Sequence, residues 1–161
     1  MKLATFSVAA ILLALPAMAS DKVELPSLGT QLALDLATET VAVCSAQGHN
    51  VAAAVTDRSG ILLALVRAEG AGNHTPDAAT AKAYTSASSR NPTSGMAKAV
   101  QENPGAAGMV DIPGFLILAG GVPVKSGDAV IGAIGVGGAP GGHLDEACAN
   151  QALEKFADRL K

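Results

Sequence analysis

The chain has 161 residues and a formal net charge of −3 at neutral pH, and aromatic residues make up 2% of it. Its lysines and arginines form no cluster, which excludes an electrostatic nucleic-acid-binding surface. With so few aromatic side chains, a folded core has to be built from alanine, valine, leucine and isoleucine, which favours closely packed helices and strands.

The N-terminus has the pattern of a secretory signal peptide. An apolar run follows Lys2, and small residues of the kind found at cleavage sites lead up to Ala19. The run is too short to span a bilayer. We therefore predict a signal peptide at residues 1–19, one domain at residues 20–161, and a periplasmic or secreted location. A second long apolar segment does not follow, so the processed chain is not expected to be embedded in a membrane.

The remaining sequence predicts helices alternating with hairpins. From apolar periodicity and turn residues we predict helices at residues 27–47, 77–89, 93–101 and 145–161, and strands at residues 51–56, 61–66, 115–119 and 130–136. One more strand can be accommodated beside the last pair. Because hairpins supply the strands, the fold class is α/β (α+β), with a mostly antiparallel sheet and helices packed on it.

Glycines interrupt the last predicted strand. Gly132 and Gly135 lie inside an apolar run, which indicates that something packs very close to the backbone there. The sequence leaves open whether this is a helix, another subunit or a flat ligand.

Cys44 and Cys148 are the two cysteines of the chain. An even number of cysteines in an exported protein permits a disulfide. The alternative is a pair of buried small apolar residues.

Three segments are specific enough to identify a family. They are AAAVTDRSGILLALVRAEGA, HTPDAATAKAYTSAS and, above all, PGFLILAGGVPVKSGDAVIGAIGVGGAPGGHLDEACA. Together they resemble the GlcG/HbpS family over about residues 27–160. The resemblance implies a profilin-like sandwich, assembly into a homo-oligomer, and haem binding or sensing. It implies at most weak haem-dependent peroxidase-like activity, so we expect a binding protein rather than an enzyme.

His74 is the strongest candidate for a haem iron ligand. It precedes the helix predicted from residue 77, and a neutral imidazole is a common axial ligand. The alternative is a loop histidine that faces water. Thr75 is a weaker candidate, since the resemblance includes a relative with a threonine ligand, but its hydroxyl is also suited to capping the helix.

Two further residues of this helix are candidates for contacts with the ligand. Lys82 is eight residues after His74 and can face the same side, where it would pair with a haem propionate or a small carboxylate. A solvated lysine is the alternative. Tyr84, the sole tyrosine, can hydrogen-bond a ligand or pack with its hydroxyl at an edge.

The glycine-rich segment 135–142 does not have the spacing of a phosphate-binding loop, although the helix that follows it can accept an anion. Asp145 and Glu146 are explained as acids in the first turn of that helix, and His143 gives no clear metal site with them. A second functional hypothesis is therefore a non-haem protein that binds a small organic acid through this segment and Lys82, or that assists a redox system.

Overall fold

The structure is a computed structural model that describes residues 21–161, so the predicted signal peptide lies outside the described residues. Its elements follow in chain order: α1 (Thr30–Ala46), β1 (Ala52–Asp57), β2 (Leu62–Arg67), α2 (Thr75–Ser89), α3 (Thr93–Glu102), the 3-10 helix η1 (Pro104–Asp111), β3 (Gly121–Ser126), β4 (Ala129–Gly137), α4 (Gly142–Lys155) and the 3-10 helix η2 (Ala157–Leu160).

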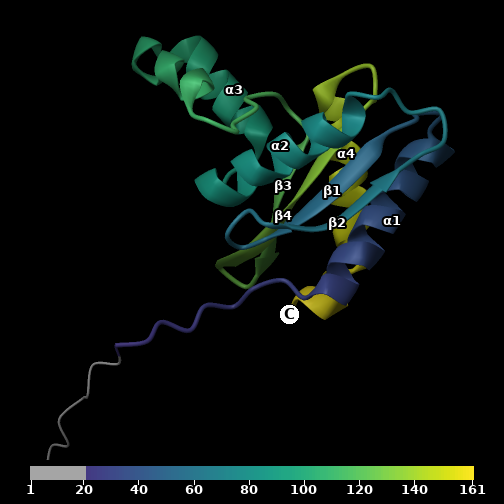
Figure 1. Ribbon diagram of the computed structural model, residues 1–161, viewed down its shortest axis with the longest axis horizontal. Coiled ribbons are helices and arrows are strands. Elements are labelled where there is room, and N and C mark those ends of the chain that lie inside the picture. The colour runs from purple at the N-terminus through teal and green to yellow at the C-terminus, as the bar shows by residue number, and fades with distance from the viewer. Residues whose placement is uncertain (1–20) are drawn as a thin grey trace, which may run out of the picture.

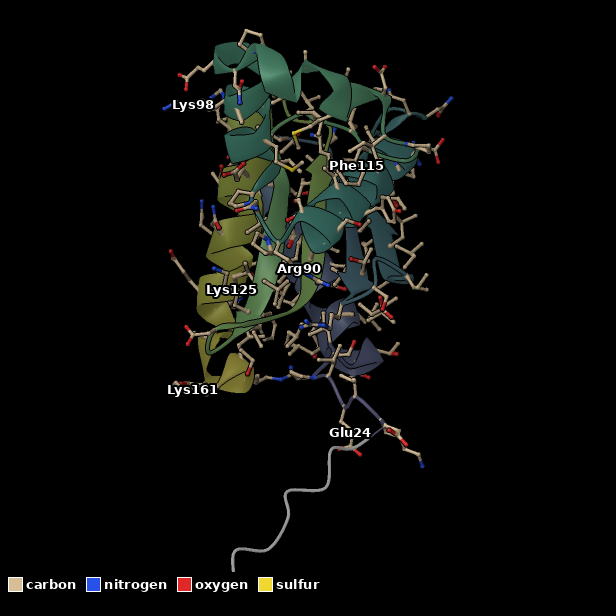
Figure 2. All side chains as sticks on the ribbon, turned by 90° about the vertical axis from the view of Figure 1, so that its left-hand side faces the viewer. Glu24, Arg90, Lys98, Phe115, Lys125 and Lys161 are labelled. Carbon is tan, nitrogen blue, oxygen red and sulfur yellow. A yellow bond between two sulfur atoms is a disulfide. The ribbon has the colours of Figure 1, made fainter. Side chains whose placement is uncertain are left out.

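The four strands form one antiparallel sheet in the order β2-β1-β4-β3, which confirms the predicted fold class. Helices α1 and α4 lie together on one face of the sheet, and α2 covers the other (Figure 1). Helix α3 and η1 project from one end of the molecule. Figure 2 shows Lys98 of α3 at that end and Lys161 at the opposite end. None of the helices within residues 21–161 is long and apolar enough to cross a bilayer.

The two faces of the sheet carry side chains of different size. Because neighbouring strand residues point to opposite faces, one strand contributes to both layers. The face under α1 and α4 is packed with larger aliphatic side chains, among them Leu36, Val55, Val124, Ile134 and Val136. On the other face, Ala52 and Ala54 of β1 pack against Ala79 and Ala83 of α2. Small residues on both partners let α2 approach the strands closely.

Gly135 of β4 is explained by this close approach. A Cβ atom added to Gly135 would lie 2.0 Å from the backbone oxygen of Ala79 and 2.4 Å from the backbone nitrogen of Ala83. A side chain at this position is therefore incompatible with the observed packing. Of the three explanations left open by the sequence, the structure selects a helix of the same chain, α2, at Gly135. At Gly132 the close neighbours also belong to this chain: an added Cβ would lie 2.4 Å from the backbone oxygen of Thr56 and 3.2 Å from the side chain of Leu28.

The first hairpin forms as its turn residues predict. Gly60 has φ of +83°, a conformation that glycine adopts without strain. The carboxylate of Asp57 accepts hydrogen bonds from the backbone N–H groups of Ser59 (2.8 Å) and Ile61 (2.9 Å). These bonds satisfy backbone donors that the turn leaves outside the strand ladder.

The strand predicted at residues 115–119 is wrong. This segment runs beside α2 and α3, and its backbone bonds to side chains there: the Leu116 N–H donates to the Thr85 hydroxyl, and the Leu118 carbonyl accepts from Thr93. The strand β3 begins only at Gly121, after Gly120 turns the chain with φ of +121°. Apolar composition is insufficient to predict a strand when other elements supply the hydrogen-bond partners.

Cys44 and Cys148 form a disulfide between α1 and α4, with Cα atoms 5.5 Å apart. Of the two alternatives that the sequence left open, a disulfide or two unpaired buried cysteines, the structure has the disulfide. The same two helices are also joined by an ion pair at 2.8 Å between Lys155, the last residue of α4, and Glu39 in the middle of α1. The face of the sheet opposite α2 is thus covered by a covalently linked helix pair.

A second ion pair connects α1 to η2. Arg159 donates to the carboxylate of Asp35 at 2.6 Å. This hydrogen bond, with a smaller contribution from Gln31, holds the pKa of the Asp35 carboxyl below its ordinary value. The pair therefore stabilises the fold above the ordinary carboxyl pKa, and this contribution is lost as the pH falls through the lower folded-state pKa.

Candidate functional site

A pocket of about 370 Å³ lies where the first turn of α2 meets the glycine-rich segment before α4. We call it the His74 pocket. It is lined mostly by glycine, alanine and proline, together with Leu118 and three side chains that can ionise. Those three are His74, Lys82 and Asp145. The fold brings two of the predicted site residues together here, from positions two turns apart on α2.

His74 occupies the position just before the first residue of α2, with its backbone carbonyl accepting from Ala78 at 3.0 Å. Its side chain is exposed and lies against Gly72, where an added Cβ would be 2.8 Å from Cε1 of the imidazole. Within residues 21–161 the imidazole has no hydrogen-bond partner. Both ring nitrogens are therefore available to a ligand or a metal.

Thr75 is buried, and it is the first residue of the helix rather than its cap. Its hydroxyl donates to the carbonyl of Gly72 at 2.8 Å. This bond ties the loop to the helix and directs the hydroxyl toward the backbone. The predicted capping role of Thr75 is thus wrong by one position, and the helix has no side-chain cap at His74.

Lys82 is only 2% exposed, so the structure excludes the solvated lysine that the sequence had left as an alternative. Its Nζ donates to the carboxylate of Asp145 and to the carbonyl of Val136, both at 2.8 Å. An ammonium group has three N–H donors. The third has no acceptor among the described residues, and Lys82 lines the pocket.

Asp145 is the residue of this site that reasoning from sequence missed. It is 3% exposed, and its second carboxylate oxygen accepts from the backbone N–H of Ala139 at 3.0 Å. Its place in the first turn of α4 is real, but the dipole does not account for its burial. The small residues around Lys82 are the signal that could have identified Asp145. They indicate close packing of the helix, and a lysine buried by such packing requires an anionic partner.

The segment 137–141 is held between α2 and α4 by this ion pair. Helix α4 begins at Gly142, and the preceding Gly141 has no side chain with which to cap it. The first N–H groups of a helix have no partner within the helix and attract anions. The pocket therefore offers N–H donors from Lys82 and from the start of α4, with the imidazole of His74 at its edge.

Tyr84 lies in a different cavity, on the side of α2 away from His74. There its ring packs edge-on against Phe115, with centroids 5.9 Å apart. The structure thus brings His74 and Lys82 together and separates Tyr84 from them. A role for Tyr84 in the His74 pocket would require a ligand that extends around α2.

The other candidates near α4 do not form a metal site. His143 is exposed, and one oxygen of Glu146 accepts from the hydroxyl of Ser94 at 2.8 Å. Within residues 21–161 no group of three or more histidine, cysteine or acidic side chains is arranged to hold a metal ion.

Comparisons with known proteins agree with the resemblance found in the sequence. The family model described as "Haem degrading protein HbpS-like" matches residues 28–154. The crystal structure of HbpS is 36% identical, with a TM-score of 0.80 over 88% of this chain and 99% of that chain. Protein ORFY of Klebsiella pneumoniae is 25% identical, with a TM-score of 0.82 over 88% of this chain and 98% of that chain.

A more distant structure shares the fold. PduOC, solved as a haem complex, is 20% identical, with a TM-score of 0.70 over 80% of this chain and 94% of that chain. A search of curated protein sequences gives no match. Because the family model covers most of the chain and the HbpS structure aligns along nearly its whole length, this protein belongs to the HbpS-like family.

Proposed function

We propose that this protein is an exported haem-binding module in which His74 ligates the haem iron. The observation that carries the proposal is the exposed imidazole without a hydrogen-bond partner among the described residues, at the edge of a pocket that contains a buried lysine. Membership of the HbpS-like family supports it, and a protein of the same fold has been solved with haem. Export is supported by the signal-peptide pattern of residues 1–19.

The residues of the His74 pocket fit the chemistry of haem. Imidazole is a common axial ligand of haem iron. The propionate groups of haem are carboxylates, which match the N–H donors of Lys82 and of the start of α4. Glycine and alanine make up much of the lining, and Leu118 adds an apolar side chain that can contact the porphyrin. Once bound, haem iron would supply redox chemistry, whereas the residues of this chain hold and orient it.

The proposal is tested by titrating the purified protein with hemin and recording the Soret band. We expect a saturable shift of the band with the unaltered protein. His74→Ala should lose the spectrum of the histidine-ligated form and bind hemin at least ten-fold more weakly. His49→Ala removes a histidine that does not line the His74 pocket and serves as the matched control.

Two outcomes separate the parts of the proposal. If no Soret shift occurs, haem binding itself is refuted. If the shift occurs equally with His74→Ala, haem binds but His74 is not the ligand. We also propose that the protein assembles into a homo-oligomer, as the family resemblance implies, and sedimentation with and without hemin measures this directly.

A second candidate function is favoured by the third N–H of Lys82. Because this donor is buried, lines the pocket and lacks an acceptor among the described residues, a small carboxylic acid would satisfy it. The start of α4 would bind the same carboxylate group. In this case the pocket serves a non-haem small organic acid, and His74 contacts its other end.

Thermal-shift measurements with short carboxylic acids distinguish the two candidates. A bound acid raises the unfolding temperature with concentration, according to its dissociation constant. The second candidate would be favoured if a carboxylic acid raises the unfolding temperature and hemin, in its own titration, produces no Soret shift. Chloride at equal ionic strength is the control for a general salt effect.

A further inference from the structure

The described structure has a second and larger cavity, a groove of about 760 Å³ on the other side of α2. We call it the Tyr84 groove. Residues of α2 that line the His74 pocket are spaced four apart, and those that line the Tyr84 groove lie on a different face of the same helix. The groove is lined by Gly60, Leu62, Leu65, Pro76, Asp77, Thr80, Ala81, Tyr84, Pro113 and Gly114. The two cavities share no lining residue.

The walls of the groove are apolar and partly open to water. Leu62 and Leu65 belong to the edge strand β2 and remain 44% and 41% exposed. Proline and alanine from α2 and the segment after η1 complete the apolar surface. Covering such side chains is favourable in proportion to the apolar area removed from water. An apolar molecule is therefore the natural occupant of the groove.

The ring of Tyr84 is held in place as one wall. Gly60 and Gly114 approach it, and Cβ atoms added to them would lie 2.7 and 3.1 Å from ring carbons. Both glycines have positive φ, near +83° and +82°, so other residues would be strained there as well. Phe115 packs edge-on against the ring. A fixed aromatic ring is a preorganised surface for a ligand.

The charge of the groove comes from Asp77. Its first-turn position on α2 is explained by the helix dipole. However, its carboxylate is exposed and forms no ion pair within residues 21–161. Lys82 and His74 line the other cavity. The Tyr84 groove thus combines an aromatic wall with an unpaired negative charge, an arrangement that attracts cations and disfavours carboxylates.

We propose that the Tyr84 groove is a separate binding site for an apolar small molecule that carries a positively charged amine. The apolar part contacts Leu62, Leu65 and the Tyr84 ring, and the ammonium group lies near Asp77. This site does not depend on haem binding, because it shares no residue with the His74 pocket.

The experiment uses two probes of equal shape and opposite charge, 1-naphthylmethylammonium and 1-naphthoate. Tyr84 is the sole tyrosine of the chain, so protein labelled with 13C-tyrosine gives ring signals from this groove alone. We expect saturable shifts of these signals with the ammonium probe and weaker binding of the naphthoate. Asp77→Asn should weaken binding of the ammonium probe about two- to five-fold, as expected for an exposed charge pair. It should also reduce the difference in affinity between the two probes.

Asp128→Asn, the same change on the exposed turn between β3 and β4, is the matched control and should leave both affinities unchanged. Leu65→Asn should weaken both probes, because it removes apolar contact without altering charge. The proposal is overturned if neither probe shifts the Tyr84 signals, or if naphthoate binds as tightly as the ammonium. It is also overturned if dilution alone shifts these signals, which would mean that a second copy of the chain covers the groove.

Discussion

The ammonium group of Lys82 is buried between α2, β4 and α4, where its partners are Asp145 and the carbonyl of Val136. Moving two charges out of water costs several kcal/mol, which a close pair with additional hydrogen bonds offsets. Gly120 leaves the necessary space, since a Cβ there would lie 2.9 Å from Nζ. The pair fixes the start of α4 against α2 and so shapes the His74 pocket.

We predict that Lys82→Met lowers the free energy of unfolding by about 3–5 kcal/mol, because it leaves the carboxylate of Asp145 buried without its cation. Lys98→Met is the control, since Lys98 pairs at 3.9 Å with Glu102 on an exposed helix surface and should cost less than about 1 kcal/mol. Urea unfolding measures both. Equal effects of the two substitutions would contradict a structural role for the buried pair.

Helix α2 lies in very close contact with the sheet. Its alanines face Ala52 and Ala54 of β1 and also Gly135 and Gly137 of β4, so at these glycines backbone lies almost directly on backbone. This proximity places His74 and Lys82 beside the segment that follows β4. The same helix separates the His74 pocket from the Tyr84 groove.

We predict that Gly135→Ala destabilises the protein by about 1–3 kcal/mol or more, because its Cβ would collide with the backbone of α2. Gly95→Ala is the opposite case. That glycine is inside α3, is exposed, and has no atom within 4 Å of an added Cβ, so alanine should stabilise by about 0.5–1 kcal/mol. Thermal and urea unfolding of both variants would measure the contrast, and a neutral Gly135→Ala would show that α2 can move away from β4.

For the molecule as a whole, the disulfide between Cys44 and Cys148 joins the first and last α-helices across a separation of 104 residues. The long loop that it closes restricts the unfolded chain. The disulfide links the pair of helices that covers one face of the sheet, whereas α2, which lines both cavities, lies on the other face.

Replacing both cysteines by alanine should lower the free energy of unfolding by about 2–5 kcal/mol. Denaturation with and without a thiol reductant checks this expectation. The reductant should destabilise the unaltered protein and have no effect on the double variant. Unchanged stability of the double variant would show that the helix pair is held mainly by packing and by the ion pair between Lys155 and Glu39.

The sequence by itself determined the antiparallel sheet, the first hairpin and the family, because these depend on local periodicity, on turn residues such as Gly60 and on motif spacing. It also placed His74 next to the start of a helix. Only the tertiary structure showed that Lys82 is buried, that Asp145 is its partner 63 residues away, and that Tyr84 lies in another cavity. It likewise assigned the third strand to residues 121–126 in place of residues 115–119. The physical reason is that burial, ion pairing and hydrogen-bond partners between distant segments are set by how elements pack, and the local sequence pattern does not contain that information.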